Sequence, residues 1–112
     1  MTASPGPGFV VLYRWRLHPG SEESFVDAWS RVSELLRSER DSLGSRLHRG
    51  SDGIWYSYAQ WPSSEARDDA FSLGSVDQQA GEQMAQAIAE RLPEIVLEAV
   101  ADFMLPIVKN GT

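Results

Sequence analysis

The 112-residue sequence contains no cysteine, which excludes disulfide bonds, thiolate metal sites and cysteine nucleophiles. Positive charge is also scarce, because 10 Lys and Arg residues against 16 Asp and Glu give a formal net charge of −6. This balance argues against nucleic acid or an anionic lipid surface as a partner, since both require a basic surface. The acidic residues lack histidine neighbours in metal-ligand spacing, so we expect no metal site.

Long hydrophobic runs are missing as well. No apolar run approaches the roughly 20 residues that span a bilayer, and residues 1–8 lack the basic and apolar regions of a secretory signal. These small, Pro- and Gly-rich residues predict a flexible N-terminal segment, and residues 9–112 predict one domain. We therefore expect a cytoplasmic protein with no membrane partner.

Two runs with the alternation of strands carry apolar side chains on both faces. In residues 9–17 one face holds Val11, Tyr13, Trp15 and Leu17, and the other holds Val10, Leu12, Arg14 and Arg16. In residues 54–61 the two faces hold Trp55, Ala59 and Trp61, and Ile54, Tyr56 and Tyr58. The length of the chain supplies only enough helix to cover one face of a sheet, so the second face would form an exposed apolar patch.

A homodimer through sheet-to-sheet packing would bury that second face. We expect it to contain Val10, Leu12, Tyr56, Tyr58, Val96 and Val100. Arg14, Arg16 and Arg46 should lie on the same surface and form ion pairs with acids such as Glu98 and Asp102, although anion binding is an alternative role for these arginines.

The remaining segments complete a βαββαβ order. Apolar residues at i, i+3, i+4 spacing predict a helix over residues 22–38, with Ser21 as its N-cap. Residues 43–49 and 54–61 flank a turn over 50–53 and predict a β-hairpin. Ser63 or Ser64 can cap a short helix, and a capping box from Ser75 to Gln78 predicts a second one that continues to about Arg91. A final strand is expected over residues 95–104.

This order predicts a ferredoxin-like α+β sandwich, in which a four-stranded antiparallel sheet carries the helices on one face. Face-to-face packing of two such sheets would produce a dimeric α/β barrel. The patterning is therefore informative about architecture and leaves the chemistry open.

Four segments together resemble the antibiotic biosynthesis monooxygenase (ABM) domain. They are FVVLYRWRLHPG at residues 9–20, the helix with Phe25 and Trp29, LGSRLHR at residues 43–49, and AQWPS at residues 59–63. The resemblance covers residues 9–104 and implies a dimeric α/β barrel with a pocket between the sheet and the helices of each subunit. It also implies a cofactor-independent monooxygenase, an oxidoreductase that acts on a quinol- or anthrone-like aromatic, or else a non-catalytic small-molecule-binding or stress-associated dimer.

Departures from the active relatives define the expected site. Haem-degrading relatives use a histidine on the second helix and an asparagine on the first strand, whereas this chain has only His18 and His48, and Tyr13 stands at the asparagine position. We therefore expect no cofactor. Quinone-forming relatives pair a tryptophan at the end of the third strand with an asparagine four residues earlier. Trp61 matches that tryptophan, and Ser57 replaces the asparagine.

The candidate site combines a few polar side chains, which can form hydrogen bonds, with a wall of aromatic residues. We expect the catalytic residues to be Tyr13, Ser57, Trp61 and His48, and the substrate-binding residues to be Val11, Trp15, Trp29, Trp55 and Phe71. Tyr13 or His48 would assist proton transfer, and Ser57 would hydrogen-bond an oxyanion. An alternative is that the aromatic residues only fill the core and that His48 is a surface or interface residue.

Overall fold

The computed structural model describes residues 8–105; apart from Gly8, the expected N-terminal segment lies outside them. Its elements, in chain order, are β1 (Phe9–Leu17), α1 (Glu22–Glu39), β2 (Gly44–Arg49), β3 (Trp55–Trp61), α2 (Ser64–Ser72), α3 (Gln78–Ala87) and β4 (Ile88–Leu97). The strands form a four-stranded antiparallel sheet in the order β2-β3-β1-β4. This arrangement confirms the predicted ferredoxin-like α+β fold.

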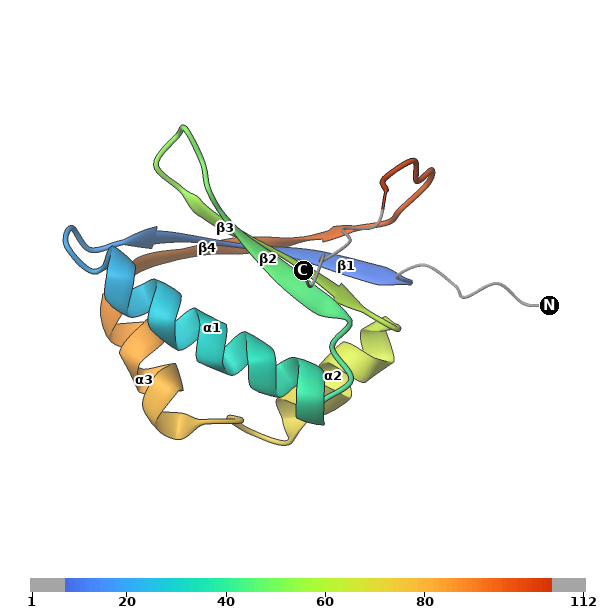
Figure 1. Cartoon of the computed structure of the whole chain (residues 1–112), viewed down its shortest axis with the longest axis horizontal. Helices are drawn as coiled ribbons and strands as arrows, with labels where there is room; N and C mark the ends of the chain where they lie inside the picture. The colour runs from blue at the N-terminus through green and yellow to red at the C-terminus, as the bar shows by residue number, and fades with distance from the viewer. Residues whose placement is uncertain (1–7, 106–112) are drawn as a thin grey trace, which may run out of the picture.

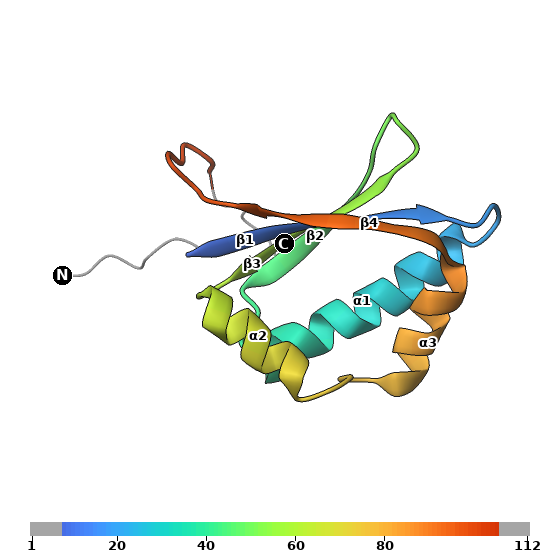
Figure 2. The ribbon, with the colours of Figure 1, turned by 180° about the vertical axis from the view of Figure 1, so that it is seen from behind.

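All the helices of the described residues cover the same face of the sheet, and Figures 1 and 2 show this layer from opposite sides. The other face is open, and the segment that follows β4 rises on that side. The alternation along β3 matches this asymmetry. Trp55, Ser57, Ala59 and Trp61 are buried toward the helices, whereas Tyr56, Tyr58 and Gln60 are half-buried.

The last strand begins and ends earlier than the sequence pattern predicts. Ile88–Leu97 forms β4, so the expected helix to Arg91 stops at Ala87, and the expected strand over residues 95–104 is wrong beyond Leu97. The reason is the register with β1, in which Leu17 pairs with Ile88 and Val10 pairs with Leu97. Past Leu97 the chain has reached the start of β1, so no further backbone remains to pair with.

Proline is tolerated inside β4 because this strand lies at the edge of the sheet. The register shifts between Leu12 and Arg14, where β4 contains one extra residue, so Pro93 and Glu94 both lie opposite Tyr13. The Pro93 carbonyl accepts hydrogen bonds from Arg14 Nε and Nη2 at 3.0 and 2.9 Å. Pro93 is therefore part of the strand.

The same register corrects the expected composition of the open face. Val96 pairs with Val11, so its side chain points to the helix side, where it is 54% exposed at the sheet edge. Val100 lies beyond β4, as do Glu98 and Asp102. Arg16 instead pairs with Glu90 of β4 at 3.2 Å. The apolar residues of β4 on the open face are Leu92, Ile95 and Leu97, which pair with Arg14, Leu12 and Val10.

The helix caps agree only partly with the sequence patterns. Ser63 caps α2 by accepting a 3.0 Å hydrogen bond from the Ala66 amide. Ser21 precedes α1 but makes no side-chain capping bond. The N-cap of α3 is Asp77, whose carboxylate accepts from the Ala80 amide at 3.0 Å, so the expected capping box from Ser75 is not formed.

Two hydrophobic clusters hold the helices to the sheet. One contains Val11, Ala59, Trp61 and Ala70, and the other contains Trp15, Phe25, Trp55 and Ala87. Tyr13 packs against both clusters. Its side chain thus stands at the centre of the helix-covered face.

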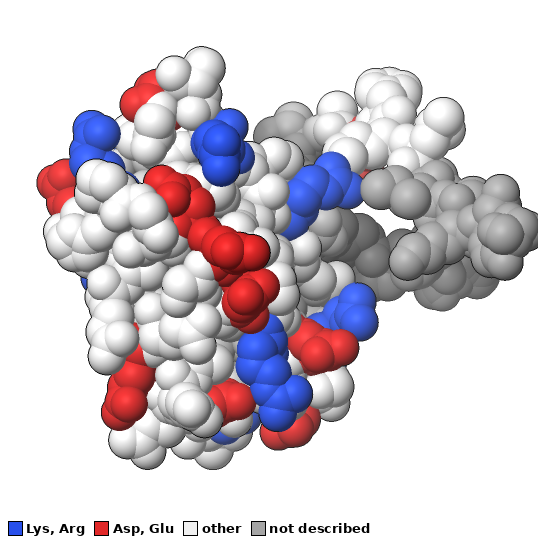
Figure 3. Space-filling view, turned by 60° about the vertical axis from the view of Figure 1, so that its left-hand side comes forward, with Lys and Arg blue, Asp and Glu red and all other residues white. Residues whose placement is uncertain are grey.

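Charged side chains tie the helices together at the surface. Arg31 of α1 binds Asp77 at 3.1 Å, and Arg40 donates to the carbonyls of Ala70 and Gly74. In Figure 3, acidic and basic side chains are interspersed on the displayed face. No helix within residues 8–105 has the length and apolar character needed to cross a membrane.

Candidate aromatic binding pocket

A pocket of about 210 Å³ lies between the sheet and the helices. Its wall contains Tyr13, Trp15, Trp29, Val32, Ser33, Leu36, Ser42, Ser45, Ser57, Ala59, Trp61, Phe71, Met84 and Arg91. Strands β1, β2, β3 and β4 and helices α1, α2 and α3 all contribute, together with the α1–β2 turn. Most of the wall is apolar or aromatic with a few polar groups, which is the usual composition of a small-molecule site.

Ser57 acts on the pocket through Trp29. The Ser57 side chain is only 2% exposed, and its hydroxyl oxygen accepts a 3.2 Å hydrogen bond from the indole Nε1 of Trp29. This bond fixes the orientation of the Trp29 ring on α1 against the floor formed by β3. The hydroxyl of Ser57 is thereby engaged in holding the wall of the pocket.

Tyr13 is tied to helix α2 by Arg67. Arg67 Nη1 donates to the Tyr13 hydroxyl at 3.4 Å and to Glu94 Oε2 at 3.0 Å, while Arg67 Nε donates to Asp68 at 3.0 Å. The guanidinium also lies over the rings of Phe9 and Phe71, with Cζ 5.4 and 5.8 Å from the ring centroids. Arg67 is therefore held in place from several sides.

These contacts determine the protonation state of both groups. Burial raises the pKa of Tyr13, and the Arg67 guanidinium opposes that rise only partly. Burial disfavours the charged form of Arg67, but its hydrogen bonds with Tyr13, Asp68 and Glu94 outweigh this effect and raise its pKa. Because a guanidinium can only donate, Tyr13 accepts from Arg67 and keeps its own proton for another acceptor.

Trp61 supplies a second donor in the same region. Its side chain is 1% exposed, and its indole Nε1 is buried without a hydrogen-bond partner among the described residues. The Trp61 N–H lies close enough to the Tyr13 hydroxyl to lower the pKa of Tyr13, without the geometry of a hydrogen bond. A buried donor without an acceptor is unfavourable. Because the Nε1 atom has almost no accessible surface, a ligand oxygen can reach it only if the Trp61 ring shifts.

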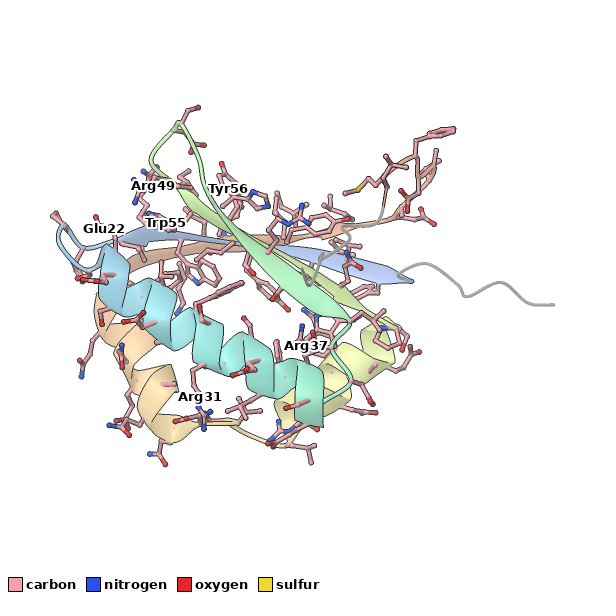
Figure 4. All side chains as sticks on the ribbon, in the orientation of Figure 1. Glu22, Arg31, Arg37, Arg49, Trp55 and Tyr56 are labelled. Carbon is pink, nitrogen blue, oxygen red and sulfur yellow. The ribbon has the colours of Figure 1, made fainter. Side chains whose placement is uncertain are left out.

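The structure brings together six of the expected site residues, namely Tyr13, Trp15, Trp29, Ser57, Trp61 and Phe71. It does not bring the other three to the pocket. Val11 is fully buried in the core next to Trp61. Trp55 packs against Phe25 in the other cluster, with Arg49 4.8 Å above its ring near the β2–β3 hairpin (Figure 4).

His48 belongs to the opposite face of the sheet. In β2, Leu47 packs into the core, so the neighbouring His48 points to the open face, where it pairs with Tyr56 and is exposed. Proton transfer by His48 inside this pocket is therefore not supported by its position. Within residues 8–105 there is also no cluster of three or more His, Cys, Asp or Glu residues that could hold a metal ion; the expectation of no cofactor stays a prediction.

Two basic residues of the site had no signal in the sequence pattern. Arg67 lies in a charged stretch of α2 that reads as a solvated surface, and only the packing of α2 on β1 brings it to Tyr13. Arg91 was placed in a helix, whereas in β4 it pairs with Trp15 and lines the pocket. Both were missed because their partners are distant in the sequence.

The geometry favours binding and stabilising a ligand oxygen over abstracting a proton. The Tyr13 hydroxyl and the Trp61 indole are both donors, and the described wall of the pocket contains no carboxylate and no histidine. Preorganised donors of this kind stabilise negative charge on oxygen. The flat apolar wall would hold an aromatic ring next to them.

A family model described as antibiotic biosynthesis monooxygenase matches residues 8–78. Among curated proteins none matches the sequence. Of the solved structures, a proposed antibiotic biosynthesis monooxygenase from Bordetella bronchiseptica is similar with a TM-score of 0.72 and 18% identity over 84% of this chain and 99% of that one. A proposed member from Caulobacter crescentus has a TM-score of 0.69 and 18% identity over 85% and 92% of the two chains.

The ActVA-Orf6 monooxygenase of Streptomyces coelicolor is also similar, with a TM-score of 0.71 and 22% identity over 93% of this chain and 96% of that one. That structure contains the ligand nanaomycin D. At these identities the three structures share the fold with this chain.

Proposed function

The chain belongs to the antibiotic biosynthesis monooxygenase family, and from this premise we propose that it binds a small flat aromatic molecule in the pocket beneath the sheet and oxidises it with molecular oxygen without a cofactor. One observation carries the proposal. The Tyr13 hydroxyl and the Trp61 indole, whose buried Nε1–H has no partner among the described residues, both belong to the aromatic wall of the pocket. That pair matches a ring with a keto or phenolic oxygen.

The reaction proposed is the oxidation of an anthrone-like methylene to a ketone by one molecule of oxygen, with one molecule of water as the second product. Loss of a proton from the methylene gives an enolate, whose electrons reduce the oxygen. One oxygen atom enters the new carbonyl group, and the other leaves as water with the two hydrogens of the methylene. The protein would hold the ring between Trp15, Trp29 and Trp61 and stabilise the enolate oxygen with the donors of Tyr13 and Trp61.

The protonation state of Tyr13 assigns its role. Since burial raises its pKa, the hydroxyl keeps its proton at neutral pH and acts as a hydrogen-bond donor to the developing oxyanion. With no base in the described wall of the pocket, the substrate must be acidic enough to ionise once its oxyanion is stabilised. Anthrones and hydroquinones meet that requirement.

The lack of a base also favours a second candidate function, a binding protein for the same class of aromatic molecule. Its pocket would use the same donors and the same aromatic wall, and the bound molecule would leave unchanged. The two functions differ in turnover and not in affinity.

We place the active form in a homodimer that packs two open faces together. That face presents Leu12, Tyr58, Ile95 and Leu97, and the helices of its own chain leave it uncovered, although Val10 on the same face is already buried. The support is the contiguous apolar surface, which is of the kind that usually marks an interface.

The proposed function is tested with dithranol, a hydroxylated anthrone. Oxygen uptake and quinone formation are followed with metal-free protein and compared with the spontaneous rate in buffer. The expected result is a faster rate that depends on protein concentration and persists with a chelator. Quenching of tryptophan fluorescence by dithranol without added oxygen uptake would support the binding protein, and the absence of both effects would reject both functions.

A further inference from the structure

The pocket differs in charge from the molecule that contains it. The chain has a formal net charge of −6, yet the wall of the pocket contains one arginine and no acidic residue among the described residues. This arginine lines the pocket and is also exposed to solvent, so salt screens part of its charge. As the only charged side chain in the described wall, it still bears on which ligands the pocket accepts.

Arg91 is the residue in question, and its placement follows from the strand register. It lies on β4 opposite Trp15 of β1, so its side chain extends on the helix side of the sheet and lines the pocket. Arg16, Arg31 and Arg67 each form an ion pair. Arg91 forms no ion pair and no side-chain hydrogen bond with the described residues, which leaves its guanidinium available to a ligand.

Two acids that bind Arg67, next to Tyr13, are already engaged. Glu94 and Asp68 both bind Arg67, which lies outside the wall of the pocket. The Ser57 hydroxyl accepts from Trp29. The Tyr13 hydroxyl and the Arg91 guanidinium remain in the wall as donors to a ligand.

Resting on the proposed function, we infer that the pocket is selective for aromatic acids, and that Arg91 is the specificity-determining residue. The ring would lie among the tryptophans, and its carboxylate would pair with Arg91. Arginine suits this role because its planar guanidinium binds a carboxylate with two parallel hydrogen bonds. Neutral aromatics of the same shape would lose that interaction.

The test compares two probes of matched shape, 1-hydroxy-2-naphthoate and its neutral amide 1-hydroxy-2-naphthamide. Affinity is measured by quenching of tryptophan fluorescence, since Trp15, Trp29 and Trp61 line the pocket. The wild type should bind the naphthoate about tenfold more tightly than the amide, the size of a charge-assisted hydrogen bond. Added salt should weaken the binding of the naphthoate and not that of the amide.

Variants of Arg91 distinguish the effect of this side chain from the effect of net charge. Arg91→Gln should bring the ratio of the two affinities close to one, whereas Arg91→Lys should keep part of the preference for the naphthoate. Arg37→Gln is the control, because Arg37 is exposed on α1, outside the wall of the pocket, and its loss changes the net charge equally.

The outcomes distinguish this inference from the proposed function. Equal binding of both probes by the wild type, or a preference that survives in Arg91→Gln, would overturn the selectivity for acids while leaving an aromatic pocket. Binding of neither probe to the folded wild type would overturn the proposed function and the inference together.

Discussion

Arg67 on α2 donates a 3.4 Å hydrogen bond to the hydroxyl of Tyr13 on β1, although the two residues are 54 positions apart in the sequence. This contact joins a helix to the central strand at the edge of the aromatic pocket. It leaves the proton of Tyr13 available to a ligand and makes Arg67 a positioning residue for Tyr13.

Replacing Arg67 should change the titration of Tyr13. In Arg67→Gln the pKa of Tyr13 should rise further, because the guanidinium lowers it in the wild type. The loss of packing on Phe9 and Phe71 should also cost about 1 kcal/mol of stability. Ultraviolet titration of tyrosinate measures the pKa, with Tyr13→Phe identifying which signal belongs to Tyr13. A pKa that falls in Arg67→Gln would contradict this account.

Trp61→Phe distinguishes the contribution of the Nε1–H donor from that of the aromatic ring. A large ring remains against Phe71, whose centroid lies 5.7 Å away, so chemical denaturation should show a loss below about 1.5 kcal/mol. Loss of the Nε1–H should weaken binding of dithranol about tenfold. Affinity equal to that of the wild type would mean that Trp61 only fills the core.

His48→Gln should leave the affinity for dithranol unchanged, because His48 lies on the open face of the sheet. Fluorescence quenching with wild type and variant side by side checks this. A marked loss of affinity in a variant that remains dimeric would show that the site reaches through the sheet or is completed by a second chain.

Leu12→Asp should disrupt the proposed dimer. Leu12 lies between Tyr58 and Ile95 on the open face, and a carboxylate there would be buried without compensation. Sedimentation should give twice the chain mass for the wild type and a single-chain mass or unfolded protein for the variant. Gln79→Glu adds the same charge on exposed α3 and should remain dimeric; a wild type that is monomeric at micromolar concentration would refute the interface.

Asp77 should make stability depend on pH in the acid range. The Ala80 amide and Arg31 lower the pKa of Asp77 below the ordinary value of 3.8. A lowered pKa in the folded state means that its contribution is complete above 3.8 and is lost as the pH falls through the folded value. Urea denaturation at several pH values should show a shallower acid decline for Asp77→Asn, which keeps a capping side chain but loses the charge. Identical profiles would exclude this role.

The predictions from the sequence pattern agree best with the structure where neighbouring residues determine the conformation of a segment. The helix expected over residues 22–38 is observed at Glu22–Glu39, because its apolar spacing and flanking residues are local. The hairpin of β2 and β3 follows for the same reason, since its turn residues adjoin both strands. Tyr13 and Trp61 could likewise be assigned to the helix-facing side of the sheet from alternation alone.

The errors arise where local patterns are compatible with two conformations. Ile88 and Leu92 fit a helical stripe, yet both belong to β4, because pairing with β1 satisfies the backbone of this segment. The same misassignment hid Arg91, whose strand position turns it toward the pocket. His48 has the chemistry of a catalytic residue, but the register of β2 directs it away from the site.

The sequence by itself determined the fold class and which aromatic residues share a face, because periodicity is a property of consecutive residues. Only the tertiary structure decided which donors remain unpartnered and where the charges lie. Arg67 reaches Tyr13 through the packing of α2 on β1, and Arg91 enters the pocket through the register of β4. Such contacts join residues that are distant in the sequence, so no local pattern records them.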